Sequence, residues 1–208
     1  MEFSQWVGIA VLCTMGAMSP GLSFAVIVQT TMQYGRRYGV IAAWAHGCAI
    51  GIYAVLTVVG LSVVLVNYDW LYQTLRWLGI AFLLYLAIQL LRAGSEPSAI
   101  DSADLAQTHR GDKLKSMQRG FLIVFLNPKV AVFFIALFSQ YIESHFTGTD
   151  KSVIVATAAG IDALWYSLVA LGFSQARVLR AFKKYQLMFN RMFSAVLFVM
   201  AITFAIFH

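Results

Sequence analysis

The sequence contains few charged residues. Lys, Arg, Asp and Glu together make up 12% of the 208 residues, whereas 60% are hydrophobic and the mean hydropathy is +0.75. A soluble globular domain carries about twice that share of charge. The composition therefore excludes an ordinary water-soluble domain and predicts an integral membrane protein.

Cysteines and catalytic motifs are also scarce. The two cysteines, Cys13 and Cys48, fall inside apolar runs, so the chain offers no disulfide framework. These runs contain no HExxH pair, no Ser/His/Asp arrangement and no cluster of Cys and His, which argues against an intramembrane enzyme. The N-terminus has Glu2 but no Lys or Arg before a long apolar stretch, which predicts a retained first helix rather than a cleaved signal.

The apolar residues gather into six runs, each close to the roughly 20 residues that a helix needs to cross a bilayer. Membrane-spanning strands would be much shorter than these runs, so the length of the runs excludes strands. We therefore predict an all-α integral membrane protein with six transmembrane helices. The expected spans are Phe3 to Met32, Val40 to Val66, Leu71 to Leu91, Phe121 to Tyr141, Val153 to Phe173, and Met188 to Phe207.

The basic residues lie on one side of this pattern. Of the fifteen Lys and Arg residues, twelve follow odd-numbered spans, and Lys151 alone follows an even-numbered one. The positive-inside rule places the twelve in the cytoplasm and both termini outside, so the net charge of +6 needs no nucleic-acid partner. The twelve are Arg36, Arg37, Arg92, Arg110, Lys113, Lys115, Arg119, Arg177, Arg180, Lys183, Lys184 and Arg191, the last of which lies in the first turn of the expected sixth span.

A polar stretch divides the chain into two halves. Residues 93–116 are rich in Ser, Asp and Gly, contain Pro97, and are expected to form a cytoplasmic linker. Residues 1–92 and 117–208 would each hold three spans. Because three is odd, the second half must enter the membrane from the opposite side, which predicts two inverted three-helix repeats.

Each half has a proline inside its first span, within Ser19-Pro20-Gly21 and Asn127-Pro128-Lys129. Proline removes a backbone hydrogen bond and disfavours helical geometry in the residue before it, so both helices should kink or break. Broken backbone at membrane depth must line a protein-enclosed or watery cavity. Paired breaks in two halves point to a transporter binding site, and a packing kink is the alternative.

Two ionisable residues, Lys129 and Asp162, are expected near the bilayer midplane, where a charge costs roughly 2.5 to 3.5 kcal/mol. Each should find a partner, and the two are candidates to meet. The alternatives are that Lys129 extends to the surface and that Asp162 packs in a protonated form. His46 is a further candidate to carry a proton, although a packed, neutral histidine is the preferred interpretation. His46 and Cys48 together provide too few ligands for a metal site.

Other polar or small residues in the spans have simpler interpretations. Arg76 is close enough to the outer end of its span to reach the headgroups. Gly47 and Gly51 form a small-xxx-small pair that permits close helix packing.

The run Met18-Ser19-Pro20-Gly21, followed by Asn127-Pro128-Lys129 and Asp162, resembles the lysine exporter superfamily, in particular its homoserine, threonine and leucine efflux branch. The resemblance extends over essentially the whole chain. It implies a proton-driven exporter of amino acids or related compounds in a bacterial inner membrane. A divalent-cation exporter of the same superfamily is the alternative.

These expectations combine into a hypothesis of zwitterion binding. An ammonium needs carboxylate or carbonyl oxygens, and a carboxylate needs cations or the free amides of a half-helix N-terminus. Asp162 would bind the amino group or carry the coupling proton, Lys129 would pair with Asp162 or the substrate carboxylate, and Ser19 and Asn127 would add polar contacts. The expected partners are this substrate, protons and lipid, with a homodimer possible; no cofactor is expected.

Overall fold

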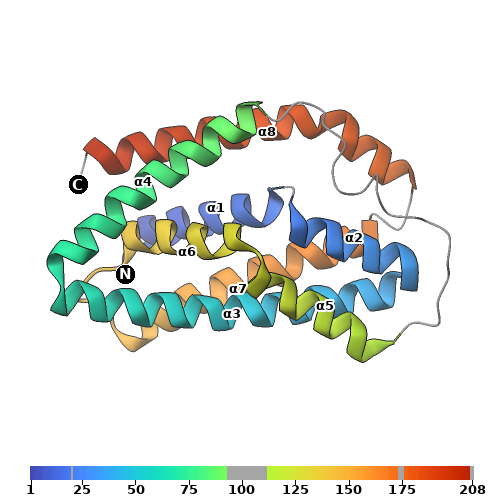
Figure 1. Cartoon of the computed structure of the whole chain (residues 1–208), viewed down its shortest axis with the longest axis horizontal. Coiled ribbons are helices and arrows are strands. Elements are labelled where there is room, and N and C mark those ends of the chain that lie inside the picture. Colours follow the sequence, from blue (N-terminus) through green and yellow to red (C-terminus); the bar gives the residue numbers. More distant parts are fainter. Residues whose placement is uncertain (20, 93–111, 173–175, 207–208) are drawn as a thin grey trace.

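The computed structural model describes residues 1–19, 21–92, 112–172 and 176–206, and within these ranges it contains eight α-helices and no strand (Figure 1). The helices run roughly along one long axis. α1 begins and α8 ends at the same end of the bundle. The helices are α1 Phe3–Met18, α2 Leu22–Tyr34, α3 Arg36–Asn67, α4 Asp69–Arg92, α5 Lys113–Leu126, α6 Pro128–Tyr141, α7 Gly148–Gly172 and α8 Ala176–Ile206.

Helix length and composition identify between four and six candidate membrane spans in the described part of the chain. Four are helices long and apolar enough to cross a bilayer: α3, α4, α7 and the stretch Leu187–Ile206 of α8. The other two are bent pairs, α1 with α2 and α5 with α6, if each pair is one span. Large apolar side chains are also exposed along the helices, as expected for a protein whose surface faces lipid.

Five of the helices (α3, α4, α5, α7 and α8) begin earlier than the apolar runs predict. α3 begins at Arg36, and α8 begins at Ala176 although its candidate span starts at Leu187, next to the predicted Met188. α5 begins at Lys113, inside the range 93–116 that the sequence assigns to the linker, because the Asp112 side chain caps it by accepting from the backbone N–H groups of Leu114 and Lys115. A polar first turn extends a helix into the interface without adding apolar residues.

Small residues bring the long helices together. α3 lies along α7, and a methyl group added at Gly47 would be 2.6 Å from the Ala163 Cβ. α3 also packs against α5, where a methyl group at Gly120 would be 2.1 Å from the backbone oxygen of Ala42. This supports the packing interpretation of Gly47. At Gly51 the approach to α7 is less close, because an added methyl group would be 3.3 Å from the Ala159 Cβ.

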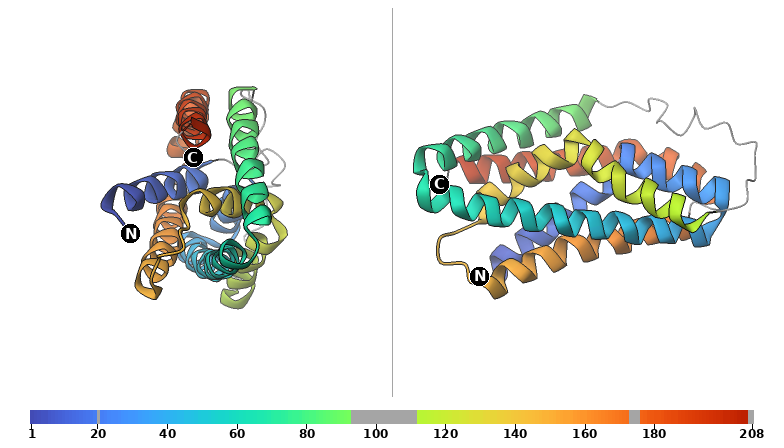
Figure 2. Two further views of the ribbon diagram at one scale, coloured as in Figure 1. Left: turned by 90° about the vertical axis from the view of Figure 1, so that its left-hand side faces the viewer. Right: turned by 60° about the horizontal axis from the view of Figure 1, so that its bottom comes forward.

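The two halves pack across each other. α3 contacts α5 and α6, while α7 contacts α1 and α2, so the long central helix of each half lies against the bent pair of the other. α4 packs against α6 and α8 on the outside of this group, as two further views show (Figure 2).

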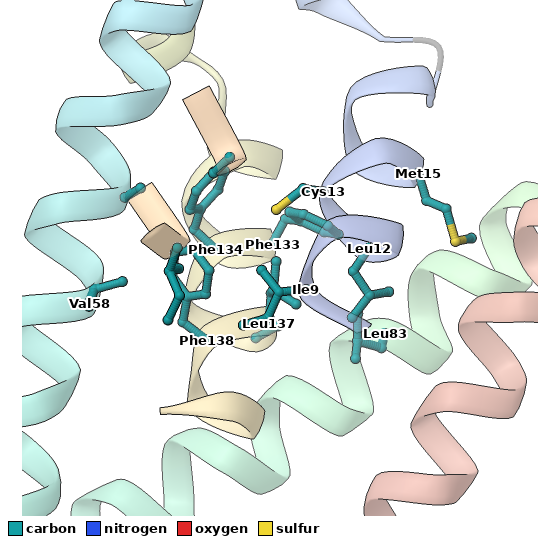
Figure 3. Close-up of a cluster of buried hydrophobic side chains, with 14 of the residues drawn as sticks. Ile9, Leu12, Cys13, Met15, Val58, Leu83, Phe133, Phe134, Leu137 and Phe138 are labelled. Atoms are coloured by element: carbon teal, nitrogen blue, oxygen red, sulfur yellow. The ribbon is translucent and has the colours of Figure 1, made fainter. Parts of the chain in front are cut away.

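An apolar core fills the bundle toward the end where α1 begins. Ile9 and Leu12 of α1 are fully buried and lie near Phe133 and Leu137 of α6 (Figure 3). The core is continuous with Phe134, which also faces the central cavity described below. The bundle is therefore sealed by hydrophobic side chains on that side of the cavity.

Candidate functional site

Both predicted proline motifs lie where a helix is interrupted. α5 and α6 meet at an angle of 60° around Asn127. The Asn127 side chain accepts from the backbone N–H of Lys129, and Pro128 occupies the first turn of α6, where its missing N–H costs no hydrogen bond. The sequence therefore breaks this span by local chemistry alone.

The first interruption has a different chemistry. α1 ends at Ser19 and α2 begins after Gly21, at an angle of 57°, and Pro20 lies outside the described residues. Gly21 caps α2 without any side-chain hydrogen bond. The N-terminus of α2 thus carries the positive end of a helix dipole with no side-chain acceptor from its own cap.

A cavity lies between the two interruptions, enclosed by α1, α2, α3, α6 and α7. It leaves about 60 Å³ for the centres of water-sized molecules, enough for several waters. Its walls are apolar except for one cluster of polar and ionisable groups. The lining residues are Cys13, Gly16, Ala17, Ser19, Gly21, Ser23, His46, Ile50, Asn127, Lys129, Val130, Phe133, Phe134, Ala158, Asp162 and Tyr166.

Two hydrogen bonds join the interruptions across the cavity. The Lys129 Nζ donates to the Ser19 Oγ at 2.6 Å, and the Asn127 Nδ2 donates to the Ser23 Oγ at 3.3 Å. Each bond links a residue of the second half to a serine of the first, more than 100 positions earlier. The two interruptions therefore form one polar structure.

The α3 and α7 side of the cavity holds a buried carboxyl group and an imidazole. The His46 Nδ1 lies 2.6 Å from the Asp162 Oδ2, and the Tyr166 ring stands edge-on to the imidazole with centroids 4.7 Å apart. The close approach of α3 and α7 at Gly47 and Ala163 places the two groups within reach, because each belongs to the residue just before the contact. Among the described residues, no hydrogen-bond partner reaches the buried His46 Nε2.

The structure brings together most of the residues that the sequence proposes. Ser19, Gly21, Asn127, Lys129, Asp162 and His46 all line the cavity. Pro128 does not: it is exposed in the first turn of α6. Pro20, the remaining proposed residue, lies outside the described part of the chain.

Lys129 and Asp162, which the sequence offers as candidates to meet, each have another partner in the structure. In the described ranges Lys129 binds Ser19 and Asp162 binds His46, and no ion pair joins the two. The reason is geometric, since α3 approaches α7 more closely than α6 does. His46, assigned by preference to simple packing, is the partner of the buried carboxylate.

Sequence reasoning overlooked Tyr166 and Ser23. Tyr166 follows Asp162 by four positions on a helix, so it shares the same face, and this spacing could have identified it. Ser23 left a weaker signal, a single hydroxyl just after the first motif. No group of three or more His, Cys, Asp or Glu residues in the described ranges lies close enough to hold a metal ion.

The arrangement separates opposite charges within one enclosed space. The Lys129 ammonium and the N-terminus of α2 lie at the helix interruptions, and the Asp162 carboxylate lies on α7. Such a space can hold a small solute that carries both an anionic and a cationic group, and His46 offers a titratable nitrogen beside it.

Comparison with known proteins gives related sequences but no related structure. The chain is 33% identical over 142 residues to the homoserine/homoserine lactone efflux protein of Salmonella typhimurium. The matched region covers 68% of this chain and 66% of that protein, which is just under two thirds of its length. It is 23% identical over 176 residues to the threonine efflux protein of Escherichia coli, covering 85% of each chain. It is also 24% identical over 191 residues to an uncharacterized membrane protein of Bacillus subtilis, covering 89% of this chain and 91% of the relative.

No solved structure matches the chain at a significant level. Residues 14–207, which are nearly the full length of the chain, match the sequence family described as LysE type translocator. The chain therefore belongs to the LysE type translocator family.

Proposed function

We propose that this protein is a secondary transporter that exports amino acids or related small zwitterions. The observation that carries the proposal is the cavity between the two helix interruptions, which is lined both by Lys129 and by the Asp162–His46 pair. Two relatives whose names describe efflux of homoserine, homoserine lactone or threonine support the same class of substrate.

The substrate carboxylate binds near Lys129 in this proposal. An ammonium has three donors, and the hydrogen bond to Ser19 uses one of them. The positive end of α2 at Gly21 also faces the cavity and attracts an anion. Together they replace the water that a carboxylate loses on entering the protein.

The substrate amino group binds at Asp162. His46 contacts one carboxylate oxygen, Oδ2, so the other oxygen is available to accept from an ammonium. The neutral form of His46 donates from Nδ1 to Asp162 in this state, and its Nε2 then carries a lone pair.

Proton entry drives export through the same pair of residues. A proton added at the His46 Nε2 creates an imidazolium that neutralises the Asp162 carboxylate and weakens its attraction for the substrate ammonium. Proton and substrate therefore compete for Asp162. Such competition couples their movements in opposite directions without requiring both to bind at once.

The transport model includes six spans in two inverted repeats, residues 1–92 and 117–208, joined by the linker 93–116. Both termini face the outside of a bacterial inner membrane. This topology is supported by the cross-packing of each bent pair on the central helix of the other half. The basic connections, which would all face the cytoplasm, support the orientation.

Reconstitution of the purified chain into proteoliposomes tests the function. Labelled threonine, homoserine, other amino acids and divalent metal ions would be offered at equal concentration to vesicles with an acidic interior, and protein-free vesicles are the control. We expect amino-acid accumulation that disappears when the pH gradient is removed. Accumulation of metal ions alone would identify a cation exporter, and no transport of any solute would refute the proposal.

A further inference from the structure

A second hollow lies at the end of the bundle where α3 and α5 begin and α7 ends. It is an open groove of about 520 Å³ and shares no lining residue with the central cavity. Three basic side chains and four apolar ones line it: Arg36, Arg37, Val40 and Ile41 from α3, Lys113 and Met117 from α5, and Leu171 from α7.

Local structure brings these cations together. Gly35, with a φ of 92°, allows a sharp turn between α2 and α3 that leaves Arg36 and Arg37 in the first turn of α3. Asp112 caps α5 and places Lys113 in its first turn. The contact between Gly120 and Ala42 holds the two helices side by side, so the positive ends of both helix dipoles lie at the groove.

Two of the groove cations, Arg37 and Lys113, have no carboxylate partner in the part of the chain that the structure describes. Asp112 is adjacent in sequence, but its side chain accepts from the backbone of its own helix. An anion entering the groove would therefore meet at least Arg37 and Lys113 without a competing acidic side chain from the described ranges.

Charge and apolar surface are separated along the membrane normal. Val40 and Ile41 follow Arg36 and Arg37 by four residues, and Met117 follows Lys113 by four. On a helix this is a displacement of roughly 6 Å. In a bilayer that α3 spans, as its length and composition indicate, the cations would lie toward the membrane surface and the apolar residues deeper, beside the acyl chains.

We propose that this groove binds one anionic phospholipid. The phosphate contacts Arg37, Lys113 and Arg36, and an acyl chain lies on Val40, Ile41, Met117 and Leu171. The apolar floor distinguishes this ligand from a free inorganic anion, which would use the cations alone. Basic pockets between spanning helices at the membrane surface are suited to anionic headgroups.

Native mass spectrometry of the full chain in detergent tests the proposal. Dioleoyl phosphatidylglycerol would be titrated against dioleoyl phosphatidylcholine, with inorganic phosphate as a third probe. The Arg37→Gln/Lys113→Gln variant removes two groove cations. The Lys115→Gln/Lys151→Gln variant removes the same charge from positions that do not line the groove.

We expect one phosphatidylglycerol to bind the wild type in preference to phosphatidylcholine. Each cation near a headgroup contributes about fivefold in affinity, so the groove variant should bind roughly 30-fold more weakly. The control variant should stay near the wild type. Equal binding of the two lipids, equal weakening in both variants, or competition by millimolar phosphate alone would each overturn the proposal.

Thermal unfolding of the same variants without lipid separates binding from folding. Both double variants should unfold near the wild-type temperature, since Arg37, Lys113 and Lys115 are exposed and Lys151 is only half-buried. Phosphatidylglycerol should then raise the unfolding temperature of the wild type and the control, but not that of the groove variant. A similar rise in all three proteins would also overturn the proposal.

Discussion

Asp162 and Lys129 illustrate how a membrane protein keeps charges away from lipid. Each has a short hydrogen bond, Asp162 with His46 and Lys129 to Ser19, and the two do not pair with each other. A direct ion pair would leave both groups neutralised and the cavity less able to bind a zwitterion. Separate partners keep two charges available at the two sides of one cavity.

The first prediction concerns Asp162. Asp162→Asn should abolish substrate accumulation driven by a pH gradient while retaining counterflow exchange, because an amide can accept from an ammonium but has no charge that a protonated His46 could neutralise. Accumulation should fall to the level of the external concentration. Vesicle uptake with and without the gradient measures the first effect, and exchange in preloaded vesicles measures the second.

Asp69→Asn is the matched control, since Asp69 is an exposed acid at the start of α4 and does not line the cavity. It should behave as the wild type. Wild-type accumulation by Asp162→Asn would place the coupling proton elsewhere.

At the level of helices, the two interruptions are alike in position but not in capping. Asn127 satisfies the N-terminus of α6 with its own side chain, whereas Gly21 offers none to α2. A capped N-terminus has less capacity to bind an external anion. We therefore assign the substrate carboxylate to the side of α2 and Lys129, and assign to Asn127 and Pro128 the task of maintaining the break.

The second prediction tests that break. Asn127→Ala/Pro128→Ala removes both the cap and the proline and should allow α5 and α6 to join, because alanine favours a continuous helix. Transport should be lost while expression and unfolding temperature stay near the wild type. Uptake in proteoliposomes and thermal unfolding in detergent measure the two effects.

Pro97→Ala serves as the control, because Pro97 belongs to neither motif. It should leave transport unchanged. Normal transport by the Asn127→Ala/Pro128→Ala variant would show that the interruption is dispensable.

The third prediction concerns the contact between α3 and α7. Gly47→Ala should destabilise the protein by about 1 to 3 kcal/mol, because the added methyl group meets Ala163 and the backbone of α7. It should also impair transport by separating His46 from Asp162. Thermal unfolding and vesicle uptake measure these effects.

Gly60→Ala lies on the same helix with no atom within 4 Å of the added carbon. It should be neutral or slightly stabilising, by up to about 1 kcal/mol, because alanine is the better helix former. Equal effects at both positions would mean that helix propensity, not packing, explains the Gly47 result.

At the scale of the whole molecule, the two ends of the helix bundle differ in charge. The end with the groove contains the starts of α3 and α5 and the basic side chains Arg36, Arg37 and Lys113 (Figure 1). The opposite end contains the starts of α1 and α7. This distribution is what the positive-inside rule requires if the first end faces the cytoplasm.

The fourth prediction concerns this orientation. In a chain without its native cysteines, Ser102→Cys should be shielded from impermeant thiol reagents in intact cells, and Asn67→Cys should be labelled. The two positions serve as controls for each other, and both should react after the cells are opened. The reverse pattern would invert the orientation, and equal labelling would indicate dual insertion.

The linear sequence determined those features that depend on local chemistry. The apolar runs of bilayer length predicted the helices. Asn127-Pro128 predicted an interruption, because a side-chain cap and a missing backbone N–H both act within one helical turn. Counting residues along a helix predicted that Lys129 and Asp162 lie well inside their apolar runs, and both line the central cavity. The start of α5 was missed, although Asp112 has the character of a helix cap.

Only the tertiary structure decided which of these residues meet. His46 and Asp162 are 116 positions apart, and Lys129 and Ser19 are 110 apart. Their contacts depend on how closely α3 approaches α7 and how the two bent pairs are rotated, which is settled by packing at Gly47 and across the cavity. Residue spacing along one helix contains no information about the rotation of another helix. The sequence therefore identified the polar and charged groups, whereas the packing of the helices determined which of them are in contact.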